Sequence, residues 1–137
     1  MALRDAVMNV DLFRNLPPAV VDELIGRGTK MQVGPGRVLV QEGAADSGLQ
    51  LILKGSAIVT VHGEARRTLT EGEYFGEISL IDGAPRSATV TAGSEGAQVF
   101  AVSPLAFSAV LSEHPTIAQT LLLTLAARIR HIESQGH

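Results

Sequence analysis

The residues with the clearest chemical potential lie in a run at positions 75–90. One carboxylate, Glu77, and one guanidinium, Arg86, stand nine residues apart there, around a short apolar segment and a proline. Gly76 can take a positive φ angle, so backbone N–H groups beside it stay open to an anion. Arg86 could give two parallel hydrogen bonds to phosphate oxygens. The run therefore suits an anionic sugar phosphate as ligand.

The carboxylate of Glu77 needs a different partner from the phosphate. A carboxylate only accepts hydrogen bonds, and a ribose hydroxyl is a donor that comes attached to a nucleotide phosphate. The segment 78–81 is long enough for one helical turn, whose first N–H groups attract negative charge. The alternative is a structural salt bridge between Glu77 and Arg86 across a hairpin.

This run resembles the phosphate-binding cassette of the cyclic nucleotide-binding domain family, which includes catabolite-activator-type transcription factors, kinase regulatory subunits and nucleotide-gated channels. The family pattern is Phe-Gly-Glu-apolar-small-Leu, a short loop, then Pro-Arg-small-Ala-Thr/Ser-Val, and every position matches. The resemblance extends over roughly residues 12–132, including the glycine spacing at Gly36, Gly43, Gly55 and Gly72. Ala44 and Leu51 depart from the acidic and aromatic residues common in the family, but they lie outside the cassette.

The resemblance implies a role for each polar group of the cassette. A cyclic phosphate is expected on backbone N–H groups, with Arg86 neutralising it and the Ser87 hydroxyl adding a hydrogen bond. Glu77 is expected to bind the ribose 2′-hydroxyl. Serine at position 87 favours cyclic AMP, because relatives with threonine there tend to prefer cyclic GMP, which stays the alternative. The residues expected on the phosphate and ribose are Gly76, Glu77, Ile78, Ser79, Arg86 and Ser87.

The base is expected to meet apolar side chains. Val59 and Val61 would wall it from a strand, and Leu121, Leu122 or Leu125 would close over it from the last helix. The resemblance implies that this helix moves when the ligand binds. Arg128 or Arg130 could rest on a purine face through a cation–π contact, although exposure to solvent is the simpler expectation. The Arg66-Arg67 pair is expected at an exposed strand edge.

Composition excludes several classes of function. The chain has 137 residues, 45% of them hydrophobic, and a net charge of −3, so it offers no general attraction to nucleic acid. It has no cysteine, and its four histidines stand without metal-ligand spacing. Ser79 and Ser87 have no histidine nearby in the sequence to activate them. We therefore expect no metal, no cofactor other than a nucleotide ligand, no catalytic residues and no enzyme activity.

The sequence also bears on the location of the protein. The first residues carry charge rather than an apolar run, which argues against a signal peptide. The longest apolar stretch, near 121–127, is far shorter than the ~20 residues that cross a bilayer. We expect no membrane span and a cytoplasmic location.

The fold is expected to be mainly β with flanking helices, in one domain over 1–137. Pro17-Pro18 opens a helix, and Ser103-Pro104 and Pro115 open two more. Glycine-punctuated strands are expected at 30–33, 37–41, 49–53, 57–62, 66–70, 87–92 and 98–102. The expected parts are an N-terminal helical segment (1–28), an eight-stranded antiparallel, jelly-roll-like β-roll (29–103) and two C-terminal helices (104–135).

The function expected from these features is a regulatory sensor module that couples nucleotide binding to movement of its C-terminal helices. The output domain or partner would lie outside this chain, which is either an excised domain or a stand-alone sensor. Apolar positions 118, 122, 125, 129 and 132 on the last helix would also allow a homodimer. Two alternatives stay open: a ligand-free roll that acts by protein–protein contact, and a cupin-like metal enzyme.

Overall fold

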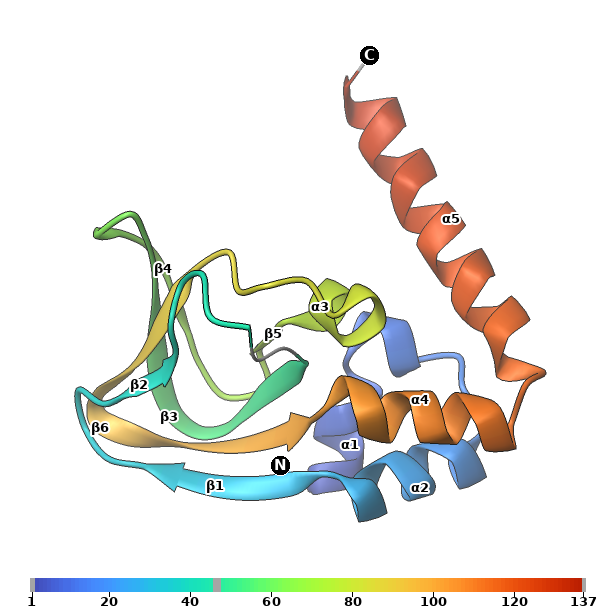
Figure 1. Cartoon of the computed structure of the whole chain (residues 1–137), viewed down its shortest axis with the longest axis horizontal. Helices are drawn as coiled ribbons and strands as arrows, with labels where there is room; N and C mark the ends of the chain where they lie inside the picture. The colour runs from blue at the N-terminus through green and yellow to red at the C-terminus, as the bar shows by residue number, and fades with distance from the viewer. Residues whose placement is uncertain (1, 46–47, 137) are drawn as a thin grey trace.

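The computed structural model describes residues 2–45 and 48–136, and it shows a strongly bent antiparallel sheet with helices gathered at one end (Figure 1). The helical elements are α1 (Leu3–Met8), the 3-10 turn η1 (Asp11–Phe13), α2 (Pro18–Arg27), α3 (Glu77–Asp82), α4 (Pro104–Glu113) and α5 (Ile117–Gly136). The strands are β1 (Thr29–Val33), β2 (Val38–Val40), β3 (Leu49–Val61), β4 (Glu64–Leu69), β5 (Tyr74–Phe75) and β6 (Thr89–Val102).

The helix starts follow from local chemistry. Pro17 caps α2, and Pro18 occupies its first turn, where a missing N–H costs nothing. Ser103 caps α4, because its side-chain oxygen accepts a hydrogen bond from the N–H of Ala106 at 3.1 Å. Both helices begin where the prolines predict, which confirms those two expectations.

The sheet has strand order β1-β6-β3-β4, with β2 pairing with β6 and β5 pairing with β3. All these pairs are antiparallel. Six strands are found among the described residues, whereas eight were expected. The reason is that β3 includes both 49–53 and most of 57–62, and β6 includes both 98–102 and most of 87–92.

Two glycines explain how the long strands bend without breaking. The register between β3 and β6 shifts on either side of residues 54–55, where a bulge lets the ladder turn. Gly55 takes a φ of +80°, and a Cβ there would lie 2.2 Å from the carbonyl oxygen of Gly96. The backbones of β3 and β6 therefore approach here more closely than a residue with a Cβ would allow.

The apolar core divides into two clusters. The roll cluster lies inside the curved sheet and contains Ile52, Leu69 and Val99. The helical cluster fills the other end, where Phe13 of η1 packs near Phe107 of α4, with ring centroids 6.1 Å apart. The cassette helix α3 contributes its buried residue Leu80 to the helical cluster, not to the roll cluster.

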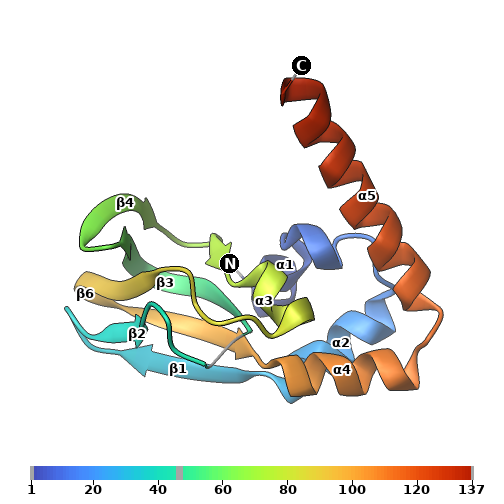
Figure 2. The same cartoon turned by 45° about the horizontal axis from the view of Figure 1, so that its top comes forward.

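The last helix, α5, projects away from the rest of the molecule in both views (Figures 1 and 2). Its start is anchored, because Ile117 and Leu121 are buried in the helical cluster. Further along the helix, Leu122, Ile129 and Ile132 are exposed. Among the described residues, no helix is both long enough and apolar enough to cross a membrane.

Candidate functional site

A cleft of about 600 Å³ lies beside α3, between the segment 85–90 and the strands β3 and β4. The cassette supplies one side of this cleft and the curved sheet supplies the other. Arg128 reaches its rim from α5. Seven of the nine predicted site residues line it, namely Val59, Gly76, Glu77, Ile78, Ser79, Arg86 and Ser87.

Arg86 is held firmly in the wall of the cleft. Arg86 is only 7% exposed, and its Nη1 donates a hydrogen bond to the carbonyl oxygen of Gly48 at 2.7 Å. Nη1 also lies 3.3 Å from the hydroxyl of Ser79, and the guanidinium stands over the Phe75 ring at 5.7 Å. These contacts orient a positive charge at the cleft.

The backbone beside Arg86 explains the glycine at position 76. Gly76 has a φ of +82°, and a Cβ there would lie 2.0 Å from the carbonyl oxygen of Gly48 and 2.6 Å from Nη1 of Arg86. Ser79 adds a hydrogen bond between the same two segments, because its hydroxyl accepts from the N–H of Gly48 at 2.9 Å. Glycine is thus required for the cassette to approach the loop before β3.

Glu77 is buried, with 6% of its surface exposed, and both its oxygens have partners. Oε2 accepts a hydrogen bond from the backbone N–H of Leu12 at 3.1 Å. Oε1 is paired with the guanidinium of Arg128 on α5. The carboxylate therefore links the cassette to η1 and to the last helix at once.

A second contact ties Arg128 to the N-terminal region. Its Nε lies 3.6 Å from Oδ2 of Asp11, and the backbone N–H of Asp11 donates to the hydroxyl of Tyr74 at 3.1 Å. Burial, as the main cause, raises the pKa of Tyr74 above its ordinary value. Tyr74, Asp11 and Arg128 thus surround Glu77 with a partly buried polar network.

Of the residues expected to contact the base, only some line the cleft. Val59 lines it together with Val40 and Val90, so an apolar wall is present. Val61 and Leu122 do not line it, and Leu122 is 67% exposed on the outward part of α5. In this structure α5 reaches the cleft through Arg128 instead.

Sequence reasoning missed two charged residues that line the cleft, Arg67 and Glu73. Arg67 was expected at an exposed strand edge, and it is exposed, but it also lines the cleft. The register explains this placement, since Arg67 pairs across the β3–β4 ladder with Val59. Cross-strand neighbours share one face of a sheet. Finding Arg67 therefore required the pairing register, which the sequence alone does not show.

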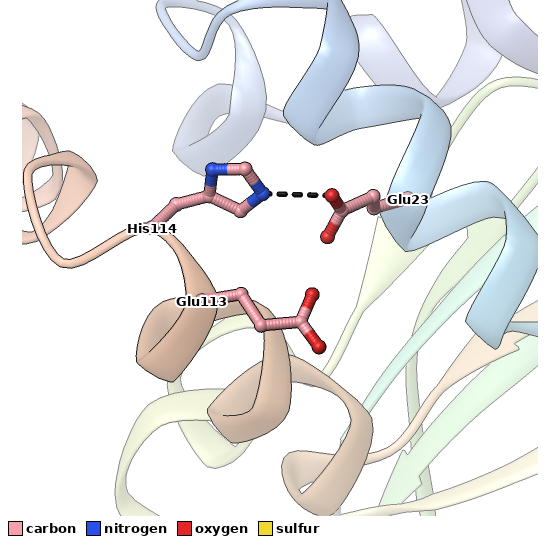
Figure 3. A group of neighbouring side chains, drawn as sticks. All are labelled: Glu23, Glu113 and His114. Carbon is pink, nitrogen blue, oxygen red and sulfur yellow. Dashed lines mark hydrogen bonds and ion pairs between the residues drawn. The ribbon is translucent and has the colours of Figure 1, made fainter.

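Outside the cleft, Glu23, Glu113 and His114 lie close together where α2 meets α4 (Figure 3). Their potential ligand atoms all lie within 4.8 Å of one another. His114 Nε2 is 2.7 Å from Oε1 of Glu23, and Arg27 Nη2 is 2.7 Å from Oε1 of Glu113. Each side chain thus has a partner on the facing helix, and the group joins α2 to α4.

This group predicts a pH effect. The hydrogen bond from His114 is the largest cause that lowers the pKa of Glu23 below its ordinary 4.5. A depressed folded-state pKa contributes stability above the unfolded value, which is lost as pH falls through the folded value. We expect the unfolding free energy of His114→Ala to fall less than that of wild type as pH is lowered through and below the ordinary Glu pKa of 4.5.

The measurement is urea unfolding over that pH range. His131→Ala is the matched control, because His131 is exposed and its side chain takes part in no described ion pair. Equal acid sensitivity in wild type and His114→Ala would show that the contact with Glu23 contributes nothing to the pH dependence.

Comparison with known families gives one match in the central part of the chain. The family described as "Cyclic nucleotide-binding domain" matches residues 30–114. The matched segment includes every strand after the first residue of β1, the cassette and α4. It therefore contains both the cleft and the polar groups that surround it.

Individual relatives agree with that match. A cGMP-dependent 3′,5′-cGMP phosphodiesterase A from Dictyostelium discoideum is 34% identical over 86 residues, which are 63% of this chain and 10% of the relative. A cAMP-dependent protein kinase regulatory subunit from Yarrowia lipolytica is 44% identical over 66 residues, 47% of this chain and 18% of the relative. The chain thus spans less than a fifth of these curated relatives.

A solved structure of similar size matches more completely. The N-terminal domain of a transcriptional regulator from Streptomyces coelicolor A3(2) superimposes with a TM-score of 0.84 at 25% sequence identity. The match covers 93% of this chain and 95% of that one. The fold is therefore shared over nearly the full length, helices included.

Proposed function

Because the chain belongs to the cyclic nucleotide-binding domain family, we propose that it is a regulatory module that binds a cyclic nucleotide in the cleft beside α3. A domain of this family is a binding fold and not a catalytic one. The observation that carries the proposal is the cleft itself, which collects a buried guanidinium, a buried carboxylate and a positive-φ glycine from one cassette.

The proposed pose follows from the charges. The cyclic phosphate lies toward Arg86, where Ser87 and the backbone N–H groups at 76, 78 and 79 add donors. The ribose hydroxyl lies toward Glu77, the one buried acceptor of the cleft among the described residues. The base lies along Val59 and its apolar neighbours, where its ring surface leaves water.

The base identity is proposed as adenine, on the strength of Ser87. A second candidate is cyclic GMP, and Arg67 is the observation that favours it. An arginine fork can give two hydrogen bonds to O6 and N7 of guanine, and adenine offers no acceptor at position 6. The relatives named above divide in the same way, one with cyclic GMP and one with cyclic AMP in its name.

We propose that nucleotide binding is communicated to a partner by movement of the C-terminal helices. A ligand can drive a change only by binding one arrangement more tightly than another. The elements that contact the cassette helix include α4 and, through Arg128, α5. A partner or output domain outside this chain would sense their movement. Homodimerisation through α5 and a cytoplasmic location stay predictions.

The test is thermal and chemical unfolding of the chain with cyclic AMP, cyclic GMP or 5′-AMP. A ligand at a hundred times its dissociation constant should add about 2.7 kcal/mol to the free energy of unfolding. We expect stabilisation by a cyclic nucleotide and much less by 5′-AMP, which carries an open phosphate with a different charge. Calorimetry then compares the two cyclic nucleotides.

Each outcome has a meaning. A tenfold or greater preference for cyclic GMP would overturn the adenine assignment and favour the role of Arg67. No stabilisation by either nucleotide would overturn the proposed function and support the alternative of a roll that acts through protein contact. One transition metal tightly bound per chain would instead favour the cupin-like alternative.

A further inference from the structure

The last helix is attached to the cleft by the same carboxylate that the proposed pose gives to the ribose. Oε2 of Glu77 accepts the Leu12 N–H, so Oε1 is the oxygen that, among the described residues, receives no backbone donor. Arg128 is paired with that oxygen. A ribose hydroxyl approaching Oε1 therefore meets a guanidinium that already occupies the position.

The two partners of this ion pair differ in burial, and this difference determines which of them can give up the contact. Glu77 has a side chain that is 7% exposed, whereas the Arg128 side chain is 37% exposed. A buried carboxylate needs a donor at each oxygen, but a half-exposed guanidinium can return to water at small cost. Glu77 can thus exchange Arg128 for a ribose hydroxyl, while losing both would leave its charge uncompensated.

The rest of α5 explains why this ion pair decides the position of the helix. Only Ile117 and Leu121, both in its first part, are buried. Arg128 lies two turns further along and contacts both α3, through Glu77, and η1, through Asp11. Beyond Leu121, Leu125 is partly buried against the helical cluster, whereas Leu122, Leu123 and Ile129 are exposed.

We propose that Arg128 competes with the ribose hydroxyl for Oε1 of Glu77, so that nucleotide binding detaches α5 from α3. This proposal rests on the proposed function. The apparent affinity of a ligand falls by the fraction of molecules that are ready to bind it. The ion pair therefore weakens nucleotide binding and holds α5 in its outward position until a nucleotide replaces it.

The first test removes the competitor. Arg128→Met keeps a long apolar stem on the helix but loses the charge, and Arg130→Met is the matched control because Arg130 is exposed on the same helix. We expect Arg128→Met to bind the preferred cyclic nucleotide about three- to tenfold more tightly than wild type. Arg130→Met should bind like wild type, and Arg128→Lys should lie between wild type and the methionine variant.

The second test measures the helix itself. The chain has no cysteine, so two spin labels can be placed without background, by Lys30→Cys on β1 and Glu133→Cys on α5, both exposed positions. We expect the distance distribution of the labelled wild type to shift when cyclic nucleotide is added. Arg128→Met should broaden or shift that distribution before any nucleotide is added, and Arg130→Met should not.

The outcomes separate this proposal from the proposed function. If wild type binds a cyclic nucleotide but Arg128→Met binds it equally or more weakly, the competition is wrong and the nucleotide site stands; weaker binding would mean that Arg128 contacts the ligand. If Arg128→Met without nucleotide has the same label distance distribution as wild type, then Arg128 does not determine the position of α5. If neither wild type nor the variant binds either nucleotide, the proposed function fails and the competition fails with it.

Discussion

Replacing Arg86 with alanine is expected to lower cyclic nucleotide affinity by tenfold or more. A charge-assisted hydrogen bond contributes roughly 1.5–3 kcal/mol, and Arg86 is the buried cation of the cleft among the described residues. Its fixed position strengthens the effect, because the hydrogen bond to the Gly48 carbonyl orients the guanidinium before the ligand arrives. Calorimetry with the preferred cyclic nucleotide gives the affinity directly.

The same substitution also removes the Gly48 contact, so the variant's own stability must be measured. Urea unfolding without ligand reports that loss, and Arg86→Lys keeps the charge without the planar fork. Ser87→Ala is a milder control, since Ser87 is exposed at the edge of the cleft and the substitution removes one hydroxyl donor but no charge. Unchanged affinity in a folded Arg86→Ala protein would mean that the phosphate binds elsewhere.

Replacing Gly76 with alanine is expected to lower the free energy of unfolding by roughly 2–5 kcal/mol. A positive φ costs a residue with a Cβ about 1–2 kcal/mol, and an overpacked contact adds a further 1–3. Both apply here, because the φ is +82° and the added Cβ would lie 2.0 Å from a backbone oxygen of Gly48. Urea unfolding without ligand measures the loss.

The matched control is at the other end of α3. Gly83 also has a positive φ, +65°, but a Cβ there would meet nothing within 4 Å. Gly83→Ala should therefore show the conformational cost alone, about 1 kcal/mol. If the two substitutions destabilise the protein equally, the close approach of Gly76 to Gly48 contributes nothing, and the cassette is less tightly held than these distances imply.

The parts of the fold that the sequence predicts well are those decided by neighbouring residues. Pro17-Pro18 and Ser103-Pro104 start their helices through φ restriction and capping, which operate within a single turn. The cassette is predicted for the same reason, since its glycine, acid, proline and arginine stand within sixteen residues. Strand number is less local, because Gly55 looks like a break in the sequence but serves as a bend within β3.

The parts that the sequence does not reveal depend on contacts between distant segments. Glu77 and Arg128 are 51 residues apart, and Leu12 is 65 residues from Glu77, so spacing gives no sign of their network. Arg67 joins the cleft wall only through its register with Val59. The base-facing role expected of Leu122 depends on where α5 lies, and that position is decided by tertiary packing near Leu121 and by Arg128.

The membership of Leu80 in the helical cluster has a mechanical consequence. Interiors are close-packed and respond to displacement by shifting as units. A displacement of α3 would therefore press Leu80 against the buried residues of its own cluster, which include Phe107 and Leu121. The same cluster contains Leu51 of β3 and Phe100 of β6, so the cassette is packed against the near end of the sheet as well as against the helices.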